Sequence, residues 1–155
     1  MRTFEAAEIL KGYGADNSLA DDFLKDEFEE YSLVNRIIAS MKTPYSGIVY
    51  CSAGDRLLVD RAVLSKVANQ LMQIKGINAC FVIGCTDNDV VRISSRSDGT
   101  VNMQLLCEKM NGGGHFTAAA SQFKNATCDK VIEILLAVLN DYLDAARSGT
   151  NTEVN

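Results

Sequence analysis

Two apolar runs that flank an amphipathic segment constrain the fold of this chain most strongly. Residues 48–51 and 79–84 are rich in β-branched, aromatic and other apolar side chains, which is typical of buried strands. Apolar residues between the two runs recur at helical spacing: Val63, Val67, Leu71 and Ile74. A strand, a helix and a second strand in this order predict a right-handed crossover between two parallel strands.

The rest of the chain continues this alternation of strands and helices. The remaining elements are expected at these residues: a strand at 90–94, a helix at 101–110, one helical turn at 117–120, a weak strand at 121–126 and a long helix capped by Thr127 or Asp129. We therefore expect an α/β (α+β) fold, with a mixed β-sheet of about four to five strands flanked by helices.

The N-terminal segment is expected to be a helical arm. Residues 3–12 indicate a short helix, and a second helix starts at Ser18 and carries an apolar stripe from Ala20 to Met41. We expect this stripe to pack against the mixed domain or against another copy of the chain. The expected organisation is a helical connector at 1–42, one mixed domain at 43–147 and a polar, frayed tail at 148–155.

A run of three glycines is the first candidate site. Gly112, Gly113 and Gly114 directly precede His115, the only histidine of the chain. Glycine allows another molecule to approach the bare backbone, and successive N–H groups can form a concave nest for an anion, particularly where a helix starts just beyond. With His115 as an added donor, the run suits a phosphate group. The alternative is a glycine-rich loop with a surface histidine.

A second candidate lies at the end of the strand predicted at 90–94. Ser94, Ser95 and Ser97 surround Arg96, whose planar fork of donors fits phosphate oxygens. The helix that separates this cluster from the glycines spans about 15 Å, so both can flank one pocket. The alternative is a polar strand-to-turn transition with a surface arginine. Asn102 is a further candidate donor, with helix capping as its alternative role.

The composition excludes several classes of function. A net charge of −5 argues against a broad surface for long nucleic acids. The cysteine count is odd, at five, and no C-x-x-C occurs, which favours free, buried thiols in a reducing cytoplasm. One histidine and scattered carboxylates do not supply the ligands of a hydrolytic two-metal centre, so we expect no catalytic and no metal-binding residue in this chain. No apolar run approaches membrane-spanning length, and no signal peptide is visible.

The two candidate sites together resemble a known family. Residues 93–97, Val101-Asn102 and 111–120 are similar to the DHH-associated domain, the C-terminal substrate-binding lobe of the DHH phosphoesterase superfamily. Further likenesses narrow the resemblance to one branch, the bacterial membrane-anchored cyclic-di-AMP phosphodiesterases: residues 2–6, 14–16, 60–62, 81–83 and 119–122. The resemblance extends from about residue 2 to 143. The chain departs from the pattern of the branch at Asn111 and Ala118.

The resemblance implies a role in substrate binding. The chain would be the lobe of a phosphodiesterase that hydrolyses cyclic-di-AMP to a linear dinucleotide, and the absent catalytic lobe of the same polypeptide would carry Mn²⁺. The expected substrate-binding residues are Ser94, Ser95, Arg96, Ser97, Asn102, Gly112, Gly113, Gly114, His115 and Thr117. Other implied partners are a short oligonucleotide and a second copy of the chain. The expected location is the cytoplasmic side, with a membrane anchor upstream.

An alternative within the superfamily is the nucleic-acid-binding lobe of an oligoribonuclease, of a nucleoside-bisphosphate phosphatase or of a RecJ-like nuclease. In each case the chain alone is expected to be inactive and to need no cofactor of its own.

Overall fold

The computed structural model describes residues 17–154, and the short helix predicted at 3–12 lies outside this range. The chain divides after Asn35 into two compact units, which are described separately below. Within the described residues, no helix combines the length and the apolar character that crossing a membrane requires.

The arm predicted from Ser18 forms one continuous helix, α2 (Asn17–Ala39). Its periodic apolar residues produce an amphipathic helix, as the sequence indicates. In the first unit the large apolar side chains of this helix are mostly exposed: Leu19 at 70%, Phe23 at 60%, Phe28 at 68% and Tyr31 at 64%. The predicted helix is confirmed, and the packing of its stripe stays a prediction.

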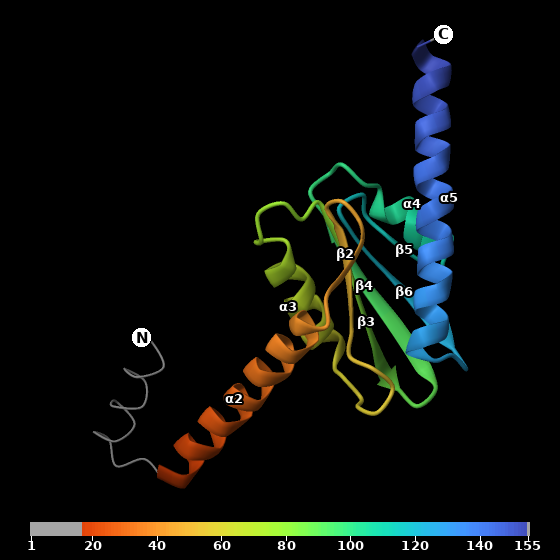
Figure 1. The fold of residues 1–155 in the computed structure, drawn as a ribbon. Helices are drawn as coiled ribbons and strands as arrows, with labels where there is room; N and C mark the ends of the chain where they lie inside the picture. Colours follow the sequence, from red (N-terminus) through yellow and green to blue (C-terminus); the bar gives the residue numbers. More distant parts are fainter. Residues whose placement is uncertain (1–16, 155) are drawn as a thin grey trace. The chain divides into compact units, whose positions relative to one another are not determined.

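The second unit contains one mixed, six-stranded sheet in the order β1-β2-β3-β4-β6-β5 (Figure 1). Its strands are β1 (Lys42–Tyr45), β2 (Ile48–Ser52), β3 (Ala79–Asp87), β4 (Val90–Ser97), β5 (Gly112–Gly114) and β6 (Ala118–Lys124). Only β2 and β3 are parallel, and the crossover between them contains the predicted helix, α3 (Arg61–Leu71). The other neighbouring strands pair antiparallel.

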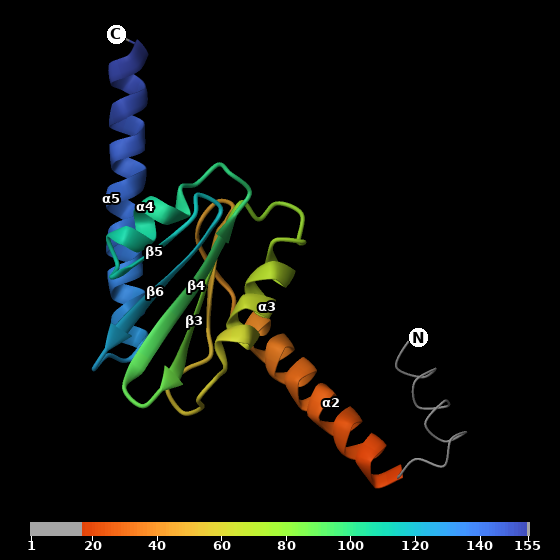
Figure 2. The ribbon, with the colours of Figure 1, turned by 180° about the vertical axis from the view of Figure 1, so that it is seen from behind.

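Helices cover both faces of the sheet (Figures 1 and 2). α3 packs on one face against β3 and β4. On the other face lie α4 (Met103–Glu108) and α5 (Cys128–Val154). Because β3 lies between these layers, its residues from Ala79 to Cys85 are all buried, which explains why its sequence is a continuous apolar run. The hydrophobic core on the α5 side includes Phe81 and Leu135, both fully buried.

The structure corrects three expectations. Residues 117–120 do not form a helical turn, because Ala118 to Ala120 pair with β4 in strand β6, and this pairing outweighs the helical propensity of alanine. The sheet has six strands, since β1 and the glycine strand β5 were not expected as strands. The tail expected at 148–155 continues α5 as helix through Val154.

Candidate functional site

On the face of the sheet against which α3 packs, the strands β4, β6 and β5 carry a strip of mainly small and cationic residues. Directly paired residues of neighbouring strands share a face, and the pairs here are Arg92 with Gln122, Ser94 with Ala120 and Arg96 with Ala118. Gly113 of β5 pairs with Ala120 and extends the middle row. We call these seven residues the open strip: Arg92, Ser94, Arg96, Gly113, Ala118, Ala120 and Gln122. All except Ser94 are partly exposed.

The guanidinium of Arg96 is fixed by three acceptors. Its Nε donates to Oδ1 of Asn69 in α3 at 3.3 Å. Its Nη1 donates to the carbonyl oxygen of Ser95 at 2.8 Å and, at 3.5 Å, to the hydroxyl of Ser94. These bonds use Nε and Nη1 and leave Nη2 of the fork for a ligand. A positioned arginine of this kind suits an oxyanion such as phosphate.

The three glycines differ in why the fold contains them. A Cβ on Gly112 would collide with the carbonyl oxygen of Ala120, and one on Gly114 would lie 2.6 Å from Cα of Ala119. Gly114 also has a φ of +145°. Gly113 has neither constraint, because its Cβ would point into open space and its φ lies outside the left-handed region. The fold therefore requires glycine at 112 and 114 and leaves the backbone at Gly113 accessible to another molecule.

The glycine run is a strand and not an anion nest. Gly112 to Gly114 form β5, which pairs with β6 at the edge of the sheet, and no helix starts beyond it. The helical turn predicted at 117–120, which would have favoured a nest, is therefore wrong, and phosphate binding at the glycines stays a prediction. His115 is exposed just after the strand, and its backbone N–H donates to the carbonyl of Ala118 at 2.7 Å.

Two of the predicted serines point into the core on the α4 side. The Ser95 hydroxyl is fully buried and donates to the carbonyl of Ala119 at 2.9 Å. The Ser97 hydroxyl donates to the carbonyl of Val101 at 2.7 Å. Side chains alternate between faces along a strand, so these two lie opposite Ser94 and Arg96. The structure thus brings Ser94 and Arg96 together and separates them from Ser95 and Ser97.

The other predicted residues lie in the segments around α4. Oδ1 of Asn102 accepts from the backbone N–H of Leu105 at 3.1 Å, so Asn102 caps α4, which is the alternative given for it above. Thr117 is exposed, and its carbonyl accepts from the N–H of Ser97 at 2.9 Å. Arg92 was not among the predicted site residues, although its spacing of four from Arg96 along one strand already places both on one face.

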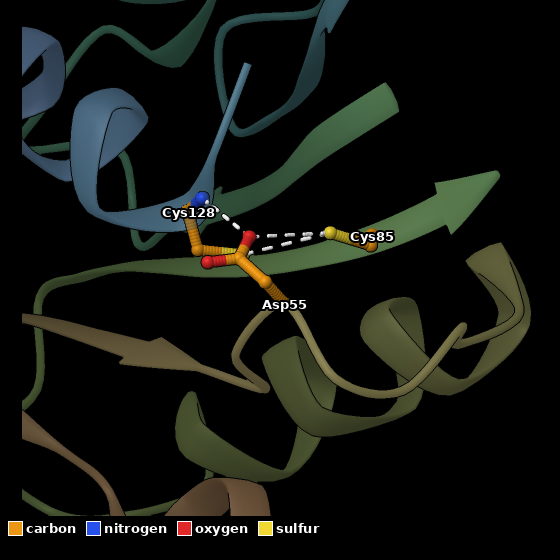
Figure 3. A group of neighbouring side chains, drawn as sticks. All are labelled: Asp55, Cys85 and Cys128. Atoms are coloured by element: carbon orange, nitrogen blue, oxygen red, sulfur yellow. Dashed lines mark hydrogen bonds between the residues drawn. The ribbon is translucent and has the colours of Figure 1, made fainter. Parts of the chain in front are cut away.

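A separate cluster offers ligand atoms for a metal ion (Figure 3). Oδ1 of Asp55 and the sulfurs of Cys85 and Cys128 all lie within 4.8 Å of one another. Asp55 already accepts a hydrogen bond from the backbone N–H of Cys128 at 2.8 Å, and this bond is the main reason why the pKa of Asp55 is lowered. Burial raises the pKa of both thiols, which keeps them protonated. Two thiols with one carboxylate suit a soft ion such as zinc and do not suit manganese.

All five cysteines are free and buried, as the sequence predicts. Burial raises the pKa of Cys51 to about 11 and that of Cys80 to about 12. Thiols with such pKa values are poor nucleophiles at neutral pH, so these residues serve as small core side chains.

Comparison with known proteins identifies the family of the chain. Residues 46–145 match the DHHA1 domain family, which is well over half of the chain, and the chain belongs to that family. The cyclic-di-AMP phosphodiesterase PdeA of Listeria monocytogenes is 30% identical over 141 residues, which are 91% of this chain and 22% of PdeA. The cyclic-di-AMP phosphodiesterase GdpP of Geobacillus thermodenitrificans is 31% identical over 146 residues, covering 94% of this chain and 22% of GdpP.

Two solved structures share the fold. An exopolyphosphatase-related protein of Bacteroides fragilis superposes with a TM-score of 0.57 at 20% identity, over 91% of this chain and 43% of its own. A pGpG-specific phosphodiesterase of Vibrio cholerae, PggH, gives a TM-score of 0.53 at 17% identity, over 75% and 40%. The chain thus spans about a fifth of its curated relatives and less than half of these two structures.

Proposed function

We propose that this chain is the substrate-binding lobe of a phosphodiesterase that opens cyclic dinucleotides, cyclic-di-AMP in particular, to linear dinucleotides. One observation carries the proposal: the fixed guanidinium of Arg96 adjoins a row of minimal side chains, Ser94, Ala120 and Gly113, on three neighbouring strands. A cation beside a flat, small-residue surface accommodates a phosphate and the nucleoside attached to it. The names of the relatives PdeA and GdpP favour cyclic-di-AMP as the substrate.

Each residue then has a distinct role. Arg96 binds a phosphate through the donors that Asn69 and Ser95 leave unused, and the Ser94 hydroxyl adds a polar contact. The bare backbone at Gly113 lets the ligand approach the sheet edge, and the exposed His115 donates from the neighbouring turn. Hydrolysis requires a separate lobe with manganese, which belongs to the same polypeptide in this proposal. We expect that polypeptide to be anchored in a membrane, with this lobe on the cytoplasmic side.

Calorimetric titration of the chain with cyclic-di-AMP and with pApA tests this site. We expect weak binding, because half of an interlobe site lacks the contacts of the other half. Arg96→Ala and His115→Ala should both weaken it, whereas Arg147→Ala, which removes an exposed cation of α5, should not. Equal affinity of the wild type and both site variants would refute the assignment. Tighter binding of a longer single-stranded RNA than of either dinucleotide would favour the oligoribonuclease or RecJ-like alternative.

The chain alone should not hydrolyse these ligands. A phosphodiesterase assay with manganese on cyclic-di-AMP and pApA should detect no turnover, because a metal centre needs several placed ligands that the described residues do not assemble for manganese. Turnover that survives repurification and disappears in His115→Ala would contradict this division of roles.

A further inference from the structure

Arg92 occupies a place on the open strip that matches that of Arg96. The two arginines lie four residues apart on one face of β4, with Ser94 between them. Arg92 pairs with Gln122 of β6 on one side and with Gly84 of β3 on the other. With a rise of about 3.3 Å per residue, the Cα atoms of the two arginines lie about 13 Å apart along the strand.

Two neighbouring positive charges act on Arg92. Burial lowers its pKa, and the positive charges of Arg61 and Arg96 lower it further. Within residues 17–154, the Arg92 side chain makes no hydrogen bond and no ion pair. Three guanidinium groups that repel one another destabilise the unliganded protein unless an anion compensates them. The chain has 20 acidic residues and a net charge of −5, yet none of the carboxylates among residues 17–154 is paired with Arg92.

The residues between the two arginines are small: Ser94 is itself buried, whereas Ala120 and Gly113 are partly exposed. Ser94 and Ala120 form the row between Arg92 and Arg96, and Gly113 continues that row to the edge strand. None of these side chains is larger than a hydroxymethyl group, so nothing on the strip stands between the two cations. One phosphate satisfies one guanidinium fork, and a second fork at this separation calls for a second phosphate.

We propose that Arg92 is a second phosphate anchor, so that the open strip selects ligands with two phosphate groups, one at Arg96 and one at Arg92. This inference rests on the proposed nucleotide binding at Arg96. It adds that the site distinguishes dinucleotides with two phosphates from nucleotides with one, and that Arg92 makes this distinction. Arg61, in the first turn of α3, contributes its charge to the same anchor.

The test compares ligands that differ in the number of phosphates. AMP and ApA carry one phosphate, whereas pApA and cyclic-di-AMP carry two. In calorimetric titrations, Arg92→Gln should weaken the binding of pApA and cyclic-di-AMP about tenfold, which is the effect of one lost charge-assisted contact. The same substitution should leave the affinity for AMP and ApA unchanged. Arg96→Gln should weaken the binding of all four ligands, and Arg147→Gln should weaken the binding of none. Arg92→Lys, which keeps the charge and loses the fork, should fall between Arg92→Gln and the wild type.

Thermal unfolding provides a second measurement, because an arginine with a merely structural role would give a different result. Because Arg92 is repelled by its neighbours and has no partner in the described chain, Arg92→Gln should leave the Tm of the unliganded protein unchanged or raise it. Addition of pApA should raise the Tm of the wild type more than that of this variant. A lower Tm of unliganded Arg92→Gln would assign Arg92 to the fold and overturn the inference.

The outcomes separate the two proposals. If Arg96→Gln weakens all four ligands and Arg92→Gln weakens none, nucleotide binding stands and the second anchor is refuted. If Arg92→Gln weakens one-phosphate and two-phosphate ligands equally, Arg92 supplies only general positive potential, and the second anchor is again refuted. If the wild type binds none of the four, both proposals fail together.

Discussion

Asn69 of α3 accepts a hydrogen bond from Nε of Arg96 at 3.3 Å, and so links the crossover helix to the cation of the candidate site. The bond orients the guanidinium without neutralising it, because an amide oxygen carries no formal charge.

Asn69→Ala should weaken pApA binding a few-fold through lost preorganisation. Asn69→Asp should weaken it further, since its carboxylate would pair with Arg96 and compete with phosphate. Titration of both variants measures the difference, and Gln70→Ala, at an exposed neighbouring position, is the control. Equal or tighter binding by Asn69→Asp would contradict this role for Arg96.

The glycine strand offers a matched pair of substitutions. Gly113→Ala should fold normally, because its Cβ meets no atom within 4 Å, and it should weaken nucleotide binding by blocking approach to the backbone. Gly112→Ala should lower the Tm, because its Cβ would clash with the backbone of β6. Circular dichroism melts and titration of each variant separate the two effects. Unchanged binding by Gly113→Ala would show that the ligand does not approach this strand.

The sequence predicts the fold of the central elements well, since strong local patterns determine them. The parallel pair β2 and β3 with α3 between them follows from two apolar runs that are buried on both faces. The glycine segment could not be predicted in the same way. β5 has no side chains, and residues 118–120 have helical propensity, so only pairing with β4 identifies them as strand.

The candidate site could be predicted only in part for a related reason. The sequence places Ser94, Ser95, Arg96 and Ser97 in one cluster, but alternation along β4 divides them between the two faces of the sheet. The same alternation brings Arg92 to the face of Arg96, because an even number of residues separates them along the strand. Counting back from Arg96 in steps of two residues therefore identifies Arg92. The neighbours on β6 and β5 depend on strand order, which local patterns do not determine.

Asp98 should make the stability of the protein dependent on acidic pH. Hydrogen bonds from the Asn78 side chain at 2.8 Å and from Thr100 lower its pKa to about 2, below the ordinary value of 3.8. A carboxyl whose pKa is lower in the folded state stabilises the fold above its unfolded pKa and loses this contribution as pH falls through the folded value. The stability difference between the wild type and Asp98→Ala should therefore be constant above about pH 4 and shrink toward pH 2. Urea unfolding at several pH values measures it, and a difference that grows on acidification would contradict the sign.

Asp55 should stabilise the start of α5. Its Oδ1 accepts from the N–H of Cys128, the first residue of that helix, although 73 residues separate the two in sequence. Asp55→Ala leaves this amide without its partner and should lower the free energy of unfolding by about 1 kcal/mol, as for a lost helix cap. Asp55→Asn keeps an acceptor oxygen and should cost less. Denaturant titrations compare the two variants, and equal losses would mean that the charge and not the hydrogen bond matters.

The apolar stripe of α2 should be covered in solution. Leu19, Phe23, Phe28 and Tyr31 are at least 60% exposed in the single chain, and each such side chain forfeits about 1.5–3 kcal/mol relative to burial. An isolated helix of this length is marginally stable in water, so slow amide exchange from Asp21 to Ile38 requires a packing partner. We expect such protection in hydrogen-exchange measurements, with a dependence on protein concentration if the partner is a second copy. A Phe23→Ser/Phe28→Ser variant should lose the protection, whereas Glu29→Gln, at an exposed position on the polar face of the same helix, should keep it. Exchange of the wild type at unprotected rates would mean that the stripe has no partner in this chain or its copies.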